Sequence, residues 1–593
     1  MSQIAQPLPP IAARGVAESA WKRRLPSLLV LALVIVIGFL VLYPLVMLVL
    51  GSFAPPRGVT DVTFSLDGYR TALSDADAQK AIVTTLWLSL VRAVLGVALA
   101  LLLAWAISRT NVPARRLFHG VMLISFFLPL LPQLVAWSLL LSPRTGTLNV
   151  WIRALVGSDA LSGPFNIYSY EGIIFLGVLG WSGFLYLFIQ PAFDAIDSSL
   201  EEAARMSGAT SLRTIIRVSA PLLMPAVLGA FGLAFIRMFE SFETELFLGA
   251  PAHIYVFTTQ IYAYIAQELT PRYPPAIALS TVFVLLTFGL ILIQRRILGN
   301  RSFVTIGGKG YKREPADLGL WRWLVFALLV FYSVVHLVLP LGMLLLGSLQ
   351  RTTVQFSMDA FTLDHWKVLF SADVWNAVKN TLIVGVASST IAILLMSVIS
   401  YVIVRTQFRL RGALDVLTWV PYMVPSFVLG VGFLWAALKG IQFPFVLYGS
   451  IALLIIAFVV RVLPLGTRLM NGTMVQLSTE LEEAARISGA GWTSTFRKIV
   501  LPILSPALGI GWLMFMVTVI RDLSTVILIY GPASAMLSVV FYAHWKSGTA
   551  EDAAVIGLLM TIIGMAMAAG IFALQHFGGR RARGLVEGTP RIV

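Results

Sequence analysis

Long apolar runs dominate this sequence. A membrane-spanning helix needs about 20 mostly apolar residues, and by that measure the 593-residue chain holds about twelve such runs. Hydrophobic residues make up 58% of the chain and charged residues 12%, against roughly 25% charged in soluble proteins. The sequence therefore predicts an all-α polytopic membrane protein and excludes a conventional soluble enzyme. The approximate spans are 27–52, 81–108, 117–141, 171–193, 220–248 and 276–294, followed by 323–349, 377–404, 413–438, 446–470, 501–530 and 553–577.

Two of these runs are interrupted by prolines. Pro129 and Pro132 lie in the third run, and Pro421 and Pro425 lie in the ninth. Broken helices are tolerated at membrane depth where they face protein rather than lipid. We therefore expect both to be kinked helices inside the bundle.

The basic residues predict the orientation of the chain. They cluster in alternate loops, whereas the loop 53–80 carries four aspartates. Cytoplasmic loops are enriched in lysine and arginine, so an even number of spans predicts that both termini are cytoplasmic. The first run is long and has no cleavage site after it, so we expect a membrane anchor rather than a removed signal peptide.

The second half of the chain repeats the first. The segment 201–209, EEAARMSGA, returns as EEAARISGA at 482–490, and Pro221 and Pro502 follow in the same register. Each half holds an even number of spans, which predicts two parallel six-helix repeats. The predicted divisions are a cytoplasmic N-terminal segment 1–26, a first repeat 27–294, a cytoplasmic linker 295–322, a second repeat 323–577 and a cytoplasmic tail 578–593.

The repeated segment is too polar to enter lipid, and we call its two copies the first and second coupling loops. In the first, residues 201–206 favour a short helix, with Asp197 and Ser198 as candidate N-caps. Gly208 is expected to end that helix, because glycine adopts a left-handed conformation at no steric cost. An ordinary interhelical loop is the alternative, but preservation in both halves indicates a shared docking surface.

The coupling loops carry the resemblance to a known family. The chain resembles the membrane-spanning subunits of binding-protein-dependent ABC importers, whose signature is Glu-Ala-Ala, three residues, Gly, nine residues and Ile-x-Leu-Pro. The first loop departs from it only in having Val218 and Ala220 at the apolar positions. The matching residues are Glu202, Ala203, Ala204, Gly208 and Pro221 in the first copy, and Glu483, Ala484, Ala485, Gly489, Ile499, Leu501 and Pro502 in the second.

The resemblance implies the partners and the location. It implies a type I importer permease in the bacterial inner membrane, with both halves in one chain, that receives solute from a periplasmic binding protein. The loops, including Glu201 and Glu482, would be coupling helices docked on a cytoplasmic ATPase. The sequence has no phosphate-binding loop, so ATP and Mg²⁺ are expected on two copies of a separate ATPase subunit, and no cofactor, catalytic residue or resident metal is expected here.

The substrate is predicted less sharply than the class. The segment from Glu240 to Glu243, together with 249–251 and 254–258, is similar to the ferric-iron-type group of fused permeases. That group also contains thiamine and 2-aminoethylphosphonate permeases, and a polyamine is a further organic alternative. An ion-gradient-driven secondary transporter also has parallel halves, but it has no reason to keep two coupling loops.

Ionisable residues inside the spans are candidates for the transport pathway, because they are costly in a membrane. Arg237, Glu240 and Glu243 are three residues apart and are expected on one helix face. In the repeat register Glu240 corresponds to Arg521, so our hypothesis is that these two pair across the pathway. The full candidate set is Arg237, Glu240, Glu243, Glu245, Arg521 and Asp522.

The alternative for these charges is local pairing, Arg237 with Glu240 and Arg521 with Asp522, without substrate contact. Glutamates would suit a cationic cargo such as Fe³⁺, whereas an anionic cargo would favour the arginines. Arg92 and His336, each alone in an apolar run, are interpreted as packing or snorkelling residues.

Overall fold

The computed structural model describes residues 20–53, 64–157, 159–196, 200, 203–204, 206–298, 316–352, 360–440 and 447–587. Within this part of the chain the structure is helical, and β-structure is limited to isolated bridges such as that between Thr110 and Ala316. Ten helices there are long and apolar enough to cross a membrane, and two bent pairs raise the number to as many as twelve. The predicted all-α polytopic fold is confirmed.

The first repeat begins with α1 and ends with α12. Its spans are α1 (Ala20–Ser52), α3 (Ala76–Arg109), the pair α4 (Arg115–Phe127) and α5 (Leu130–Leu141), α7 (Tyr170–Ala195), α10 (Ala220–Phe239) and α12 (Tyr273–Leu298).

The second repeat follows the same order. Its first span joins α13 (Trp321–Ser333) to α14 (Leu339–Leu349) through a π-helical turn, Val334–Val338. The others are α15 (Ala372–Arg405), the pair α16 (Arg411–Trp419) and α17 (Ser426–Lys439), α18 (Ile451–Val475), α21 (Leu501–Arg521) and α23 (Ala550–Glu587).

Both spans that contain paired prolines are broken, as predicted. The chain turns by 101° between α4 and α5, and by 105° between the helical segment ending at Met423 and α17. Pro129 and Pro425 are the N-cap residues of α5 and α17. Proline has no amide hydrogen to continue the preceding helix but fits the start of the next one, so each break falls at a proline.

The fifth and eleventh spans are shorter than predicted. Instead of running through 248 and 530, the helices end at Phe239 and Arg521. Hydroxyl groups bind backbone carbonyls beyond each end: Thr258 donates to Ser241 (2.6 Å) and Ser538 to Asp522 (2.7 Å). These bonds satisfy groups that a continued helix would have used. The expectation that Arg237, Glu240 and Glu243 share a helix face is therefore wrong, because Glu243 lies beyond the helix end.

The first span of each repeat packs against the other repeat. α1 lies along α16 and α17, and α14 lies along α5. Small residues allow close approach: a Cβ on Gly432 of α17 would lie 3.1 Å from the carbonyl oxygen of Pro44 in α1. Small residues commonly form such helix contacts in membranes. The two repeats are thus interlocked rather than merely adjacent.

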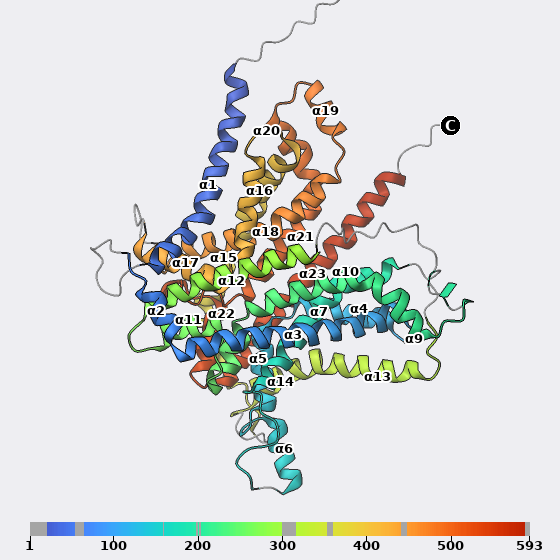
Figure 1. Cartoon of the computed structure of the whole chain (residues 1–593), viewed down its shortest axis with the longest axis vertical. Coiled ribbons are helices and arrows are strands. Elements are labelled where there is room, and N and C mark those ends of the chain that lie inside the picture. The colour runs from blue at the N-terminus through green and yellow to red at the C-terminus, as the bar shows by residue number, and fades with distance from the viewer. Residues whose placement is uncertain are drawn as a thin grey trace, which may run out of the picture.

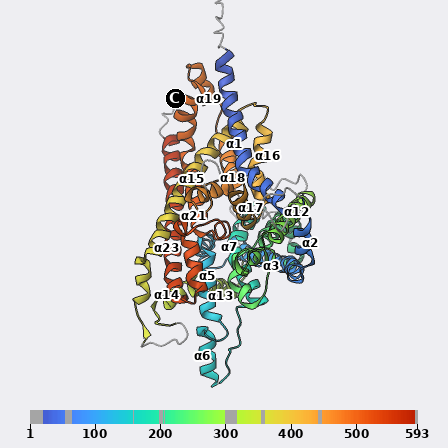
Figure 2. The same cartoon turned by 90° about the vertical axis from the view of Figure 1, so that its left-hand side faces the viewer.

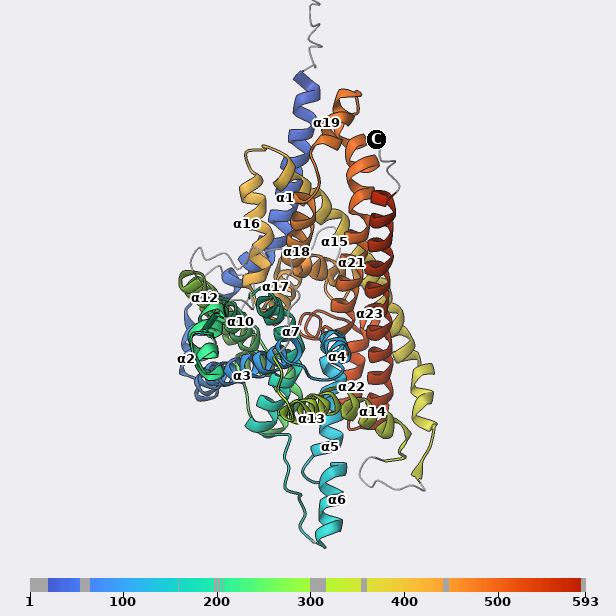
Figure 3. The same cartoon turned by 90° about the vertical axis from the view of Figure 1, so that its right-hand side faces the viewer.

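The long helices of the two repeats run in different directions. In Figure 1, α3 and α10 cross the view while α18 and α21 run upward, so the ends that carry the coupling loops, near α9 (Ser211–Thr214) and α19 (Glu480–Ile487), lie far apart. Figures 2 and 3 show α6 (Thr147–Val156) extending from the opposite end of the molecule. This helix belongs to the insertion that makes the first repeat longer.

The helices extend past several predicted divisions. α1 begins at Ala20, within the segment expected to precede it, and α23 continues to Glu587 in the expected tail. α12 and α13 include both ends of the predicted linker, and residues 299–315 lie outside the described part of the chain.

Candidate coupling loops and transport pathway

The two coupling loops end in the same turn. In the second, α19 is followed by Gly489 with φ +81°, and the Ala490 amide donates to the Ala485 carbonyl (2.9 Å). In the first, Gly208 has φ +83° and the Ala209 amide donates to Ala204 (3.0 Å). Only glycine adopts this conformation without strain, so the predicted helix end at Gly208 is confirmed, and Gly489 forms the same turn in the second loop. The candidate residues Glu201 and Glu202, and the candidate caps Asp197 and Ser198, lie outside the described residues.

The second loop has an inner and an outer face. Glu482 and Ala485 are buried against the rest of the chain, whereas Glu483, Ala484 and Ile487 are exposed. We predicted one docking surface containing all four Glu and Ala residues. In this conformation Glu482 and Ala485 instead face the membrane helices, because residues three apart share a helix face.

An apolar side chain projects from each loop at the equivalent position. Met206 in the first loop is 91% exposed and Ile487 in the second is 88% exposed. Both lie on loops too polar for lipid, where a large exposed apolar side chain suggests a contact surface. Ala203 is exposed and Ala204 half-buried beside Met206. Each loop therefore exposes a large apolar side chain at the equivalent position, and we call this side chain the apolar knob.

The repeats also share individual hydrogen bonds. Thr85 of α3 accepts from the Phe257 amide at 2.8 Å, and its counterpart Thr381 of α15 accepts from Leu537 at the same distance. These bonds cap α11 (Phe257–Tyr262) and α22 (Leu537–Lys546). The duplication therefore extends to the polar contacts that position these short helices.

One residue is in direct contact with its own counterpart in the other repeat. Glu243 and Ser524 lie 281 positions apart, the separation of the two coupling loops, and the Glu243 carboxylate accepts from both the amide (3.2 Å) and the hydroxyl of Ser524. Tyr262 and Tyr542, at matching places in α11 and α22, likewise lie close enough to influence each other electrostatically. Two equivalent residues can touch only at the pseudo-twofold axis, so these contacts locate that axis.

The charged residues near this axis form different pairs from those we hypothesised. Glu240 pairs with Arg237 at 3.2 Å, as in the local alternative, and not with Arg521. Asp522 pairs with Arg461 of α18 at 2.5 Å, so the local Arg521–Asp522 pair is not formed either.

Two arginines reach the broken span of the opposite repeat. The Arg237 guanidinium lies 4.8 Å from the ring centre of Tyr422, and Arg521 donates to the Phe126 carbonyl at 3.4 Å. Tyr422 and Phe126 both lie just before the proline breaks. These contacts link the end of α10 or α21 to the third span of the other half. The sequence analysis missed Arg461. Its charge inside the apolar tenth span was the signal that could have marked it as a pathway candidate.

Glu245 is enclosed in a buried ion pair. Its carboxylate lies 2.7 Å from the Arg92 guanidinium, and the two side chains are 0% and 1% exposed. Ser241 donates to the same carboxylate (2.6 Å), and Arg92 also donates to the Met238 carbonyl (3.1 Å). Arg92 is thus a packing residue, as interpreted, but one with a specific partner. The sequence signal that could have linked these two charges is that both are absent from the second repeat.

An aspartate caps the N-terminal end of α3. Asp75 accepts from the Asp77 amide (2.9 Å) and the Tyr264 hydroxyl (2.7 Å), and Arg272 lies 3.7 Å away. Burial raises the pKa of Asp75, but the hydrogen bonds from Tyr264 and the backbone outweigh it and hold that pKa below its usual value. Asp373, one residue inside α15, lies 3.3 Å from His544 at the matching end of the second repeat.

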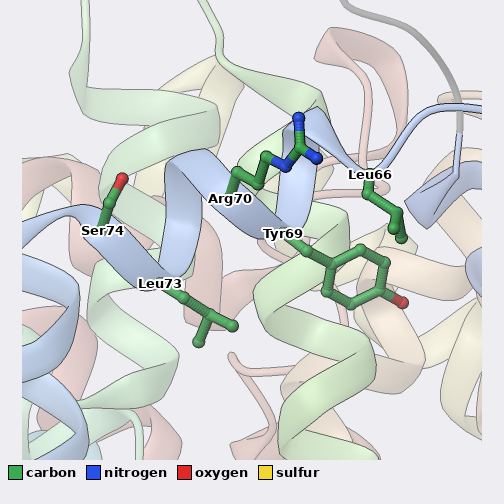
Figure 4. Close-up of a pocket in the computed structure, with 5 residues that line it drawn as sticks. All are labelled: Leu66, Tyr69, Arg70, Leu73 and Ser74. Atoms are coloured by element: carbon green, nitrogen blue, oxygen red, sulfur yellow. The ribbon is translucent and has the colours of Figure 1, made fainter.

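The described residues hold no preformed metal cluster at these charges. Among the described residues, no group of three or more His, Asp or Glu side chains is placed to hold a metal ion. A shallow, open hollow lies on α2 (Asp67–Ser74), where Tyr69, Arg70 and Leu73 point in different directions (Figure 4). Its lining comes from one helix and the residue before it, so we assign it no role in transport.

Comparison with known families decides the class. The family model described as "Binding-protein-dependent transport system inner membrane component" matches residues 93–300 and 393–584, one segment in each repeat. The chain belongs to this family. The predicted resemblance is confirmed, and so is the assignment as a multi-pass transport permease rather than an ion-gradient-driven transporter.

Individual relatives span most of the chain. The "Putative ferric transport system permease protein FbpB 1" of Haemophilus influenzae is 28% identical over 493 residues, covering 81% of this chain and 74% of the relative. The "Ferric transport system permease protein FbpB" of Actinobacillus pleuropneumoniae is 28% identical over 492 residues, covering 81% and 68%. A crystal structure of a bacterial ABC transporter "involved in the import of the acidic polysaccharide alginate" matches 47% of this chain and 97% of its own at 22% identity, with a TM-score of 0.39. That score is low, so the assignment rests on the sequence matches.

Proposed function

We propose that this chain is the complete membrane pathway of an ATP-driven importer that carries ferric iron from a periplasmic binding protein to the cytoplasm. The observation that carries the proposal is the pair of coupling loops with the same glycine turn and the same exposed apolar knob. Two equivalent docking surfaces call for two copies of a cytoplasmic ATPase, which would hold ATP and Mg²⁺. The termini and both loops are then cytoplasmic, in keeping with the basic residues around them.

The helices suggest how ATPase movement would reach the pathway. α21 runs from just after the second coupling loop to Arg521, three residues before the axial contact of Ser524. At 1.5 Å per residue a helix of this length spans roughly 30 Å. α10 makes the same connection to Glu243 in the first repeat. When the ATPases draw the two loops together, both helices pivot and the Glu243–Ser524 contact separates.

We place the cargo path along the pseudo-twofold axis, past Glu243. In the described part of the chain no Lys or Arg lies within ion-pair distance of its carboxylate, which is held only by Ser524. A carboxylate released from a serine is a suitable oxygen donor for a hard cation such as Fe³⁺. Arg237, Glu240, Arg461, Arg521 and Asp522 would form the charged walls around it, whereas the Arg92–Glu245 pair leaves Glu245 no free carboxylate.

An organic cargo is the second candidate, and one observation favours it. Within the described residues Arg521 has no carboxylate within ion-pair distance, and its guanidinium donates to a backbone carbonyl. A free guanidinium suits an anionic oxygen group, as in 2-aminoethylphosphonate, whereas thiamine or a polyamine would depend on the glutamates alone.

Uptake of ⁵⁵Fe(III) in the native bacterium, with and without this gene, tests the cargo. Loss of uptake on deletion, restored by the wild-type gene, is expected, and unchanged uptake would refute ferric iron. Cross-linking tests the path: the chain has no cysteine, so Glu243→Cys with Ser524→Cys creates a single designed pair. Oxidation should join the two and lower transport below that of the same double variant kept reduced, which already lacks the Glu243 carboxylate. Each single substitution is the control, and unimpaired transport in the cross-linked protein would refute an axial path.

A further inference from the structure

The buried glutamate of the second coupling loop ties that loop to the membrane helices. One Glu482 oxygen accepts from the Tyr401 hydroxyl at 2.8 Å, and the other lies 3.3 Å from Nε of Arg405. Both partners lie in the last two turns of α15, and the Glu482 and Arg405 side chains are 7% and 10% exposed. Hydrogen bonds to an ionised group are stronger and more directional than neutral ones, so α19 is fixed to the end of α15.

The same two residues gather the neighbouring helices. Arg405 donates to the carbonyls of Met474 (2.9 Å) and Leu477 (2.6 Å), at and just past the end of α18. The Tyr401 ring packs edge-on against Trp492 and Phe496, which begin the helix leading into α21. Glu482 is therefore the point where α19 joins the ends of α15 and α18 and the start of the eleventh span.

The first repeat carries different side chains at several of these positions. Arg109, the counterpart of Arg405, donates to the Ile196 carbonyl at 3.2 Å, which matches the bond to Leu477. Trp105 stands at the position of Tyr401, and Ser211 and Ile215 stand where the second repeat has the aromatic residues Trp492 and Phe496. The tyrosine hydroxyl and its aromatic cluster thus belong to the second repeat alone.

We propose that Tyr401, Arg405 and Glu482 are positioning residues that fix the second coupling loop to the helix ends around it. Movement of the ATPase against the outer face of α19 then passes directly into α15 and α21. Transport depends on this link. This inference rests on the proposed function.

Tyr401→Phe is the sharpest variant, because it removes one hydroxyl and keeps the ring in its cluster. Tyr332→Phe is the matched control, because it also removes one buried tyrosine hydroxyl, which is hydrogen-bonded to Ser182 (2.6 Å) rather than to the coupling loop. The whole transporter would be purified from its native membrane through a tag on this chain and reconstituted with its binding protein loaded with ⁵⁵Fe(III). We expect Tyr401→Phe to lower the iron transported per ATP hydrolysed by about tenfold, the factor that corresponds to one hydrogen bond to a charged group. Tyr332→Phe should leave that ratio close to wild type.

The ratio separates coupling from folding. A residue needed only for stability lowers ATPase activity and transport in the same proportion, so an unchanged ratio in Tyr401→Phe would overturn the proposal. An equal fall in both variants would also overturn it, because the loss would then not be specific to the coupling loop. If the tagged wild-type chain carries no ATPase, or its complex moves no iron, the proposed function fails and the positioning role with it.

A spectroscopic measurement reports stiffness without transport. Spin labels on Ile487→Cys of α19 and Ile391→Cys of α15 occupy exposed positions in a chain without native cysteine. The distance distribution between them should be narrow in the otherwise unchanged chain and broad after Tyr401→Phe. Equal widths would count against the proposal.

Discussion

The buried pair of Arg92 and Glu245 makes the sharpest energetic prediction. Two unit charges 2.7 Å apart attract by about 6 kcal/mol at an effective dielectric constant of ~20. Much of that offsets the desolvation of both groups, but removing one partner of a buried pair costs about 3–5 kcal/mol. Glu245→Met should therefore destabilise the protein by that amount, because the remaining guanidinium cannot lose its proton. Arg92→Met should cost less, because the remaining carboxyl group can become neutral by protonation.

The double variant Arg92→Met/Glu245→Met should recover most of the loss. Replacing a buried ion pair by apolar residues of similar volume is often neutral or stabilising. The second repeat supports this, because it carries Ser388 in α15 and the buried Val526 at the two positions and folds without the charges. The sum of the two single-variant costs should exceed the cost of the double variant by about 3 kcal/mol, which is the upper end of the interaction energies seen between contacting residues.

The free energies would be measured by SDS-induced unfolding in mixed micelles, alongside ⁵⁵Fe(III) uptake by the same variants in cells. Arg70→Met is the control, because its ion pair with Asp67 is 3.7 Å long and exposed and should be worth less than about 1 kcal/mol. A stable double variant with no uptake would show that Glu245 acts in transport itself. A Glu245→Met cost no larger than that of the control would refute the energetic reasoning.

Three further perturbations test local geometry. Gly489→Val should lower transport per ATP without loss of folding, because a left-handed backbone costs a branched residue about 1–2 kcal/mol. Nothing lies within 4 Å of the new Cβ, so the cost comes from the backbone alone. Gly489→Asn should therefore have a milder effect, and equal effects of the two variants would refute a backbone cause. Gly177→Ala should lower the unfolding temperature, because its Cβ would lie 2.4 Å from Cδ of Arg92, whereas Gly120→Ala has open space and should not. The lowered pKa of Asp75 means that its stabilisation is full above the ordinary carboxyl pKa and is lost as pH falls below about 4. The stability difference between wild type and Asp75→Asn should therefore shrink in unfolding measured from pH 6 to pH 3, and a constant difference would contradict this.

Features that depend only on residues close together in the sequence were determined by the sequence alone. Apolar runs predicted the spans, Pro129 and Pro425 predicted the two breaks, and Gly208 and Gly489 predicted the turns of the coupling loops. Each of these follows from backbone restrictions or from the cost of burying peptide groups in lipid. The duplication predicted the parallel repeats and, with the family motif, the transport class.

The partners of the charged residues were decided only by the tertiary structure. Equivalent positions suggested that Glu240 would face Arg521, but Glu240 pairs with Arg237 and Asp522 pairs with Arg461. The repeat register does predict which residues approach the axis, as Glu243 and Ser524 do. It cannot predict ion pairs, because a shift of one or two ångströms or an early helix end changes which charges meet. Glu482 is buried although the next residue, Glu483, is exposed, and this too was set by the way α19 packs on α15. The sequence could not predict which of the two adjacent glutamates would face the membrane helices, because both belong to the same motif.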